Sequence, residues 1–282
     1  MKSLPTNTEN SLTYRLLKHP LVRLVLGMVF VSLGTMGARI VMLEWMGAAE
    51  IVGGTAVLCC GILSYILFVR LIEKRPVNEL ALNQAVPHTL YGLLIGWLLM
   101  SSAVAVLYWQ GFYQITAYNG LHAMAGSLMV GLVPAFLEEI MFRALIFRLL
   151  QEWLGSWVAL LASGVLFGLV HIVNPGATLW SSLAIGLEAG VLLGAAYLLT
   201  RTLWLAIGIH FAWNFSQSGL YGLPTSGIQT TGLVKAQMSG PEILTGGSFG
   251  IESSILAVVF CLGAAVIMLW RAPKHPSAHS AP

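Results

Sequence analysis

Ionisable and amide side chains interrupt three apolar stretches of this sequence, each time at the spacing of one helical turn. They are Glu138, Glu139, Arg143, His171, His210 and Asn214, with Phe167 one turn before His171. Charged side chains at bilayer depth cost about 2.5–3.5 kcal/mol each on insertion scales, so they indicate function by default. Peptide hydrolysis is a chemistry that suits these residue types, because it needs a polarised water and donors for a developing oxyanion.

The two adjacent carboxylates are expected to differ in role. On a helix with about 3.6 residues per turn, Glu139 and Arg143 lie on one face and can pair, while Glu138 points about 100° away. Pro134 lies four residues before Glu138 and is expected to kink the helix beside the acids. The spacing therefore predicts one paired carboxylate, Glu139, and one free carboxylate, Glu138, which is suited to act as a general base.

The other two motifs supply the remaining groups that hydrolysis needs. His171 is expected either to share the water with Glu138 or to donate a proton. His210 and Asn214 supply side-chain donors that point in one direction, as an oxyanion site requires. None of these motifs contains a Ser or Cys with a matching base, which counts against a covalent nucleophile.

The composition predicts an all-α, polytopic transmembrane bundle. The chain has 282 residues, of which 57% are hydrophobic and 9% charged. Its net charge of +3 is too small, and its Lys and Arg too scattered, for a nucleic-acid surface. Eight apolar stretches approach the ~20 residues that a bilayer demands. They are 21–43, 48–71, 88–109, 121–148, 156–172, 179–199, 203–220 and 252–270.

The connections between these stretches predict an orientation and a division of the chain. Lys and Arg concentrate in every second connection, so both termini are expected to be cytoplasmic in a multi-pass protein of the cell membrane. The expected parts are a cytoplasmic tail (1–20), spans one to three (21–120), a catalytic core (121–220), an extracytoplasmic loop (221–251), and a last span with a disordered tail (252–282). The loop is interpreted either as a lid or re-entrant segment near the site or as a plain surface loop.

The sixth span has two polar or small-residue features of its own. Ser182, Gly186, Gly190 and Gly194 recur every four residues and predict a face on which a neighbouring helix approaches closely. Glu188 projects from the opposite side of this span. It is interpreted as a hydrogen-bond or charge partner within the bundle, with direct contact to substrate as the alternative.

Together the three motifs resemble those of the CPBP family of intramembrane endopeptidases, which includes the type II CAAX prenyl proteases, bacteriocin-processing proteins and Abi-like proteins. The motifs are Glu-Glu-x-x-x-Arg at 138–143, Phe-x-x-x-His at 167–171 and His-x-x-x-Asn at 210–214. The resemblance spans about residues 121–217. It implies that Glu138, His171, His210 and Asn214 are catalytic, that Glu139 and Arg143 orient the first helix, and that the substrate is a membrane-associated protein or peptide.

The use of a metal stays open in the sequence. Glu138, His171 and His210 are a legitimate Zn²⁺ ligand set with water in the fourth position. A water activated by glutamate without metal explains the same residues. The metal-free version is favoured, because Asn is a poor Zn²⁺ ligand and a good oxyanion donor.

Two other classes of function compete with the protease. Intramembrane Glu and His also mark the ion paths of transporters and proton relays, but this sequence lacks the paired hydrophobic halves of many transporters. A non-catalytic membrane scaffold or immunity protein is the second alternative. Only a scaffold would keep its function after Glu138→Ala or His171→Ala.

Overall fold

The computed structural model describes residue 16 and residues 18–273, so most of the expected N-terminal tail and the end of the C-terminal tail lie outside the described residues. All eight predicted spans coincide with helices. The first three are α2 (Pro20–Arg39) with η1 (Ile40–Trp45), α3 (Glu50–Leu67) with η2 (Phe68–Glu73), and α4 (Ala85–Trp109), which follows the short turns η3 (Asn78–Leu80) and η4 (Leu82–Gln84).

The remaining spans form the second part of the chain. They are η5 (Leu121–Met124), α5 (Ala125–Glu139), η6 (Ile140–Phe147) and α6 (Arg148–Leu154); α7 (Ser156–Val170) and η7 (His171–Val173); α8 (Leu179–Ile185), η8 (Gly186–Gly190) and α9 (Val191–Thr200); α10 (Trp204–Phe215) and η9 (Ser216–Leu220); and α12 (Ile255–Arg271) after η10 (Ile251–Ser253). The segments η1, η2, η6, η8 and η9 are π-helical continuations of α-helices.

Within the described residues, five helices are long and apolar enough to cross a membrane. They are Pro20–Trp45, Glu50–Glu73, Asn78–Trp109, Ser156–Val173 and Leu179–Thr200, and the apolar helix Ile255–Arg271 is shorter. The helix with Glu138, Glu139 and Arg143 carries more charge than these five. The expected helical membrane bundle is confirmed, while the number of eight crossings stays a prediction.

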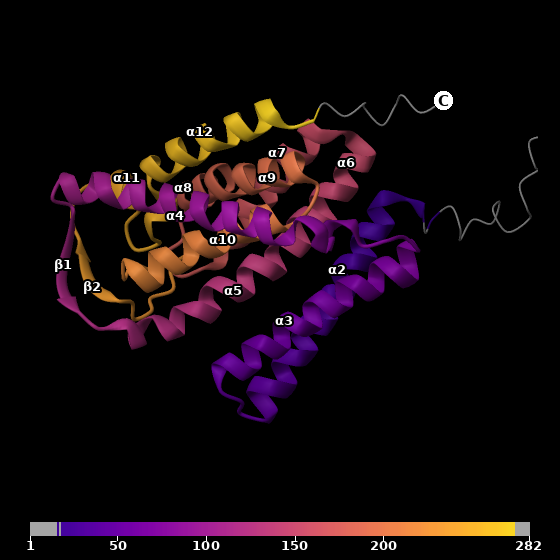
Figure 1. Cartoon of the computed structure of the whole chain (residues 1–282), viewed down its shortest axis with the longest axis horizontal. Coiled ribbons are helices and arrows are strands. Elements are labelled where there is room, and N and C mark those ends of the chain that lie inside the picture. The colour runs from indigo at the N-terminus through magenta and orange to yellow at the C-terminus, as the bar shows by residue number, and fades with distance from the viewer. Residues whose placement is uncertain (1–15, 17, 274–282) are drawn as a thin grey trace, which may run out of the picture.

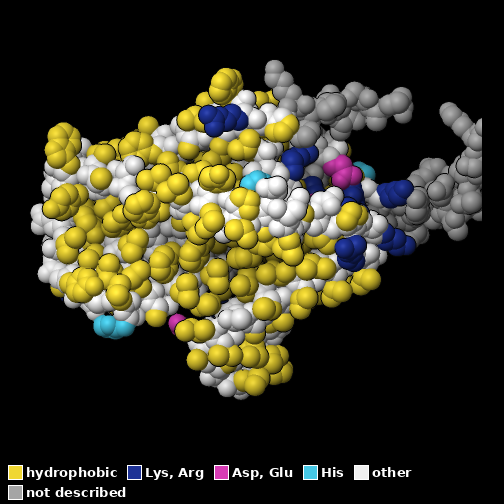
Figure 2. Space-filling model, viewed as in Figure 1, with side chains coloured by type: hydrophobic (Ala, Val, Ile, Leu, Met, Phe, Trp, Pro, Cys, Tyr) yellow, Lys and Arg dark blue, Asp and Glu magenta, His cyan; other side chains and the backbone are white. Residues whose placement is uncertain are grey.

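The helices form a bundle from which one hairpin diverges. Figure 1 shows α4, α9, α10 and α12 running side by side, with α5 below them and the α2–α3 hairpin pointing away. The hairpin packs against α5 and α6. Figure 2 shows apolar side chains covering the flank of the molecule, as expected for a surface that faces lipid.

A two-stranded sheet, absent from the sequence prediction, closes one end of the bundle. Strand β1 (Tyr113–Tyr118) pairs antiparallel with β2 (Val234–Met238), and α11 (Glu242–Thr245) follows. Tyr113 donates its hydroxyl to the Tyr221 carbonyl at 2.9 Å, and burial raises the pKa of this phenol to about 12. The expected loop 221–251 is therefore partly regular structure, tied to the end of the third span.

Close backbone contacts place the catalytic helices. On α4, a Cβ at Gly96 would lie 2.3 Å from the Ile209 carbonyl oxygen of α10, next to His210. On α7, a Cβ at Gly168 would lie 2.1 Å from the Ser182 carbonyl oxygen of α8. The predicted small-residue face of the sixth span is confirmed, because a Cβ at Gly186 or Gly190 would lie 2.9 or 2.7 Å from backbone atoms of Gly164 on α7.

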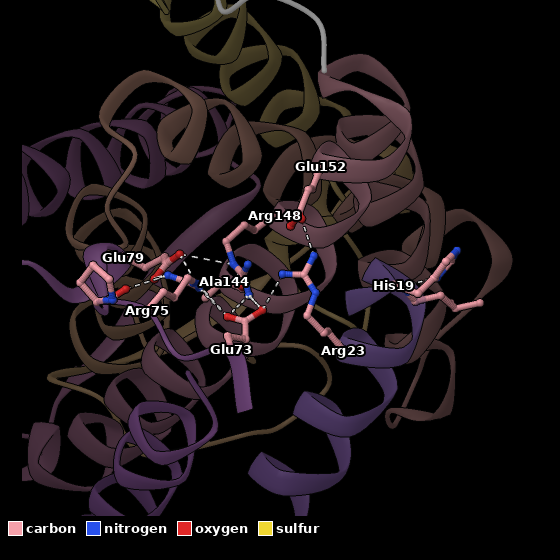
Figure 3. A network of polar contacts seen from close by, with 10 residues as sticks. His19, Arg23, Glu73, Arg75, Glu79, Ala144, Arg148 and Glu152 are labelled. Carbon is pink, nitrogen blue, oxygen red and sulfur yellow. Dashed lines mark hydrogen bonds and ion pairs between the residues drawn. The ribbon is translucent and has the colours of Figure 1, made fainter. Parts of the chain in front are cut away.

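A network of charged side chains joins the N-terminal hairpin to the helix that carries the acid pair (Figure 3). Glu73 of η2 accepts two hydrogen bonds from Arg148 of α6, at 2.8 and 2.9 Å, and one from Arg75 at 2.8 Å. It also lies 3.4 Å from Arg23 of α2. Glu79 adds contacts to Arg75 at 3.0 Å and to Arg148 at 3.3 Å. The network holds together three segments that are distant in sequence: α2, residues 73–79 and α6.

We expect Glu73→Gln to lower the thermal stability of the purified protein. The Glu73 side chain is fully buried and faces three guanidinium groups, so its neutralisation leaves excess positive charge at a cost of about 1–3 kcal/mol. Glu152→Gln is the matched control, because the Glu152 side chain is 48% exposed and its ion pair with Arg23 lies at the surface. Melting temperatures in detergent test this, and equal shifts for the two variants would contradict it.

Candidate active site

The three sequence motifs meet at one cavity of about 110 Å³. Its lining includes Glu138 at the end of α5, His171 at the start of η7, and both His210 and Asn214 on α10. Phe167 lines it as well, whereas Glu139 and Arg143 lie behind the wall. The structure thus brings together the four residues for which the resemblance implies catalysis, from three helices.

Glu139 and Arg143 form the predicted buried ion pair. Arg143 Nη1 donates to Glu139 Oε1 at 2.9 Å, and both side chains are almost fully inaccessible to solvent. The other end of the guanidinium donates to the carbonyls of Ala189 at 3.0 Å and Gly190 at 3.2 Å. Its carbon also lies 4.7 Å from the centre of the Phe167 ring. Arg143 therefore fixes the first catalytic helix to the sixth span.

Glu139 also fixes the orientation of His210. His210 Nδ1 lies 2.9 Å from Glu139 Oε1. A carboxylate paired with Arg143 can only accept hydrogen bonds, so Nδ1 is the donor. The other ring nitrogen, Nε2, lies 3.9 Å from Glu138 Oε2. His210 can therefore donate a hydrogen from Nε2 only as an imidazolium, the form that the Glu139 carboxylate stabilises.

A backbone hydrogen bond determines which ring nitrogen of His171 carries a proton. Its Nδ1 lies 2.7 Å from the Phe167 carbonyl oxygen, which can only accept, so Nδ1 carries the proton. Nε2 of the neutral imidazole is consequently an acceptor. The backbone of its own helix sets this tautomer, because Phe167 is one turn earlier on α7. The Phe-x-x-x-His spacing thus has a local structural consequence.

Glu138 is the free carboxylate of the pair. Its side chain is 28% exposed, whereas that of Glu139 is inaccessible. Glu138 Oε2 has no hydrogen-bond partner within the described residues. Glu138 lines the cavity while Glu139 turns toward Arg143, as the helical spacing predicts.

The structure adds lining residues that the sequence interpretation did not assign. Asn174 follows His171 in the next turn, Trp213 precedes Asn214, and Glu252 lies ahead of the last helix. In the sequence, only the positions of Asn174 and Trp213 close to motif residues indicate that they belong to the site. Glu188 also lines the cavity, and its side chain is in contact with the Cys261 thiol.

The lid segment, residues 222–232, covers one side of the cavity. Thr225, Ser226 and Ile228 of this segment belong to the lining. Its backbone is tied down by hydrogen bonds from Ser226 N to Glu252 Oε2 at 2.6 Å and from Gly227 N to the Phe249 carbonyl at 2.7 Å. Of the two interpretations of this loop, the structure therefore supports the one that places it next to the site.

The described residues do not form a ready metal site. Nowhere among them do three His, Cys, Asp or Glu side chains form a group that could hold a metal ion. Glu138, His171 and His210, the alternative zinc ligands that the sequence suggests, therefore do not form such a group in this structure.

Comparison with known proteins bears on the same segment. Residues 120–216 match the model of the Rce1-like family, described as type II CAAX prenyl endopeptidases. No curated protein and no solved structure matches the chain. The matched segment contains all three motifs and the helices α5, α7 and α10 that place them. Through this segment, which is about a third of the chain, the protein is similar to the CPBP/CAAX protease family.

Proposed function

We propose that this protein is an intramembrane endopeptidase that hydrolyses a peptide bond of a membrane-associated protein or peptide with a water activated by Glu138 and His171. One observation carries the proposal: Glu138, His171, His210 and Asn214 line a single cavity in a bundle of apolar helices. Similarity to the family supports a CAAX-type endopeptidase in general.

The geometry supports a specific division of work. Glu138 takes a proton from the water, whose oxygen bonds to the substrate carbonyl carbon, and the acceptor Nε2 of His171 orients that water. The electron pair of the carbonyl moves onto its oxygen. The Asn214 amide and the imidazolium Nε2–H of His210 donate to this oxyanion.

Collapse of the intermediate completes the reaction. Protonated Glu138 returns the proton to the amide nitrogen as the carbon–nitrogen bond breaks, which yields a carboxylic acid and an amine. Glu139, Arg143 and Phe167 act as positioning residues. Their contacts fix the helix, the tautomer of His210 and the ring of His171.

The substrate class follows from the family and the setting. The family description names CAAX prenyl endopeptidases, so a lipid-anchored protein or peptide at the bilayer is the proposed substrate. Comparative membrane peptidomics of wild type against Glu138→Gln tests the function. Peptides that accumulate only in cells with the wild-type protein support the proposed function. Identical peptidomes in wild-type cells and in Glu138→Gln cells, with both proteins shown to be produced, would overturn it.

We propose that catalysis needs no metal. Asn214 suits an oxyanion better than Zn²⁺, and among the described residues no group of three His, Cys, Asp or Glu side chains is arranged to hold a metal ion. Purified protein is expected to keep its activity in chelator and to contain less than stoichiometric zinc. Complete inactivation by chelator that Zn²⁺ restores would reverse this assignment, because a required metal can be stripped.

The proposed location is the cell membrane, as a multi-pass protein with cytoplasmic termini. Lys and Arg gather at the end of the molecule where α2 begins (Figure 2), as the positive-inside rule expects for a cytoplasmic face. The lid segment and the sheet lie at the opposite end. Single cysteines introduced at residues 229–231 are expected to react with a membrane-impermeant label added from the outside. Reaction from the cytoplasmic side alone would reverse the orientation.

A further inference from the structure

The cavity contains two carboxyl side chains that the proposed reaction does not use. Glu188 and Glu252 both line it, and each is only 2% exposed. The lining holds no Lys or Arg within the described residues. Arg143 lies nearby, but it is engaged with Glu139 and with two backbone carbonyls. Besides His171 and His210, which the proposed reaction uses, the wall around the reacting groups therefore carries carboxyl groups and no Lys or Arg among the described residues.

Glu188 is held in place by its helix and has no ion-pair partner among the described residues. It lies in the π-helical segment η8 (Gly186–Gly190), and such segments frequently occur at functional sites. Arg143 holds the backbone of this segment through Ala189 and Gly190, not through the Glu188 carboxyl. The Cys261 thiol, a weak donor, is the side-chain partner of Glu188. A buried carboxyl group that lines a cavity can accept hydrogen bonds from a ligand that enters it, and charged donors make the strongest of these bonds.

Glu252 and its neighbours add directed polar groups. Ser226 donates to Glu252 from its backbone N at 2.6 Å and from its hydroxyl at 3.2 Å, which fixes the carboxylate against the lid segment. Two further groups of the lining, Thr225 Oγ1 and Trp213 Nε1, are buried without a hydrogen-bond partner. Buried polar groups are normally paired, so these indicate a polar ligand that the cavity receives.

We propose that Glu188 and Glu252 form a subsite for a Lys or Arg side chain next to the scissile bond of the substrate, an inference that rests on the proposed protease function. An ammonium or guanidinium group can donate hydrogen bonds to both carboxyl groups, which can only accept when ionised. An acidic side chain in the same place adds another buried acid beside Glu188 and Glu252, so the subsite also disfavours such substrates.

The first experiment uses a proteome-derived peptide library and the purified full-length protein in detergent micelles. Cleavage sites are read by mass spectrometry, and Glu138→Gln serves as the blank. We expect Glu138-dependent sites to carry Lys or Arg within two residues of the cut, about tenfold more often than the library does, the factor expected from one charge-assisted hydrogen bond. Glu138-dependent cleavage without this enrichment overturns the subsite. Absence of any Glu138-dependent cleavage overturns the proposed function itself.

The second experiment removes the positive charge from the substrate peptide. In the best-cleaved peptide, the basic residue is replaced by acetyl-lysine, which keeps the length and removes the charge. We expect kcat/KM to fall about tenfold for wild type, and to fall less for Glu188→Gln and Glu252→Gln. Glu242→Gln, which removes an exposed carboxylate of α11, is the matched control and should keep the wild-type ratio. Equal rates for both peptides with wild type would overturn the proposal, even if neither cavity variant folds.

Discussion

Glu138→Gln is expected to remove nearly all turnover and to leave the folded protein as stable as wild type. The amide keeps the volume of the side chain but cannot take a proton from water, and general-base catalysis typically contributes about 10²–10⁴-fold in rate. Stability should change little, because Glu138 Oε2 has no hydrogen-bond partner in the described part of the chain and the side chain is partly exposed. Single-turnover cleavage and melting temperature, measured on one preparation, test both parts.

Two controls separate loss of the base from general damage to the site. Glu152→Gln removes a carboxylate near the opposite end of the same long helix and should retain activity. No substitution of a neighbouring residue should rescue Glu138→Gln. Substantial turnover by Glu138→Gln would mean that another group activates the water, and a large loss of stability would mean that Glu138 has a structural role.

The parts of the site that were predictable from sequence depend on local geometry. The i, i+4 spacing of Glu139 and Arg143 determines their ion pair, and it holds although the helix becomes π-helical at Ile140, directly after Glu139. His171 obtains its hydrogen-bond partner, the Phe167 carbonyl, from its own helix. These relations need only a helix, and the sequence predicts the helix well.

The remaining parts depend on how distant segments meet. Glu188 and Glu252 line one cavity because η8 and the turn ahead of α12 converge there, and no sequence spacing contains that information. The pairing of β1 with β2 likewise joins segments more than a hundred residues apart, without the short turn that marks a hairpin. The bond of His210 to Glu139 spans 71 positions and follows from the packing of α10 beside α5.

Glu139→Gln is expected to lose both stability and activity, in contrast to Glu138→Gln. The substitution leaves Arg143 without its counter-charge in a buried setting, and removing one partner of a buried pair commonly costs ~3–5 kcal/mol. The same oxygen, Glu139 Oε1, also receives His210 Nδ1, so the neutral amide no longer stabilises the imidazolium that donates to the oxyanion. We therefore expect a lowered melting temperature together with a reduced single-turnover rate.

The double variant Glu139→Gln with Arg143→Met separates these two consequences. It removes both charges, so part of the lost stability should return, although Arg143 also donates to the Ala189 and Gly190 carbonyls and full recovery is not expected. The rate should stay low, because His210 remains without its carboxylate. A stable but inactive Glu139→Gln beside an unstable Glu138→Gln would show that the two adjacent acids have the opposite roles.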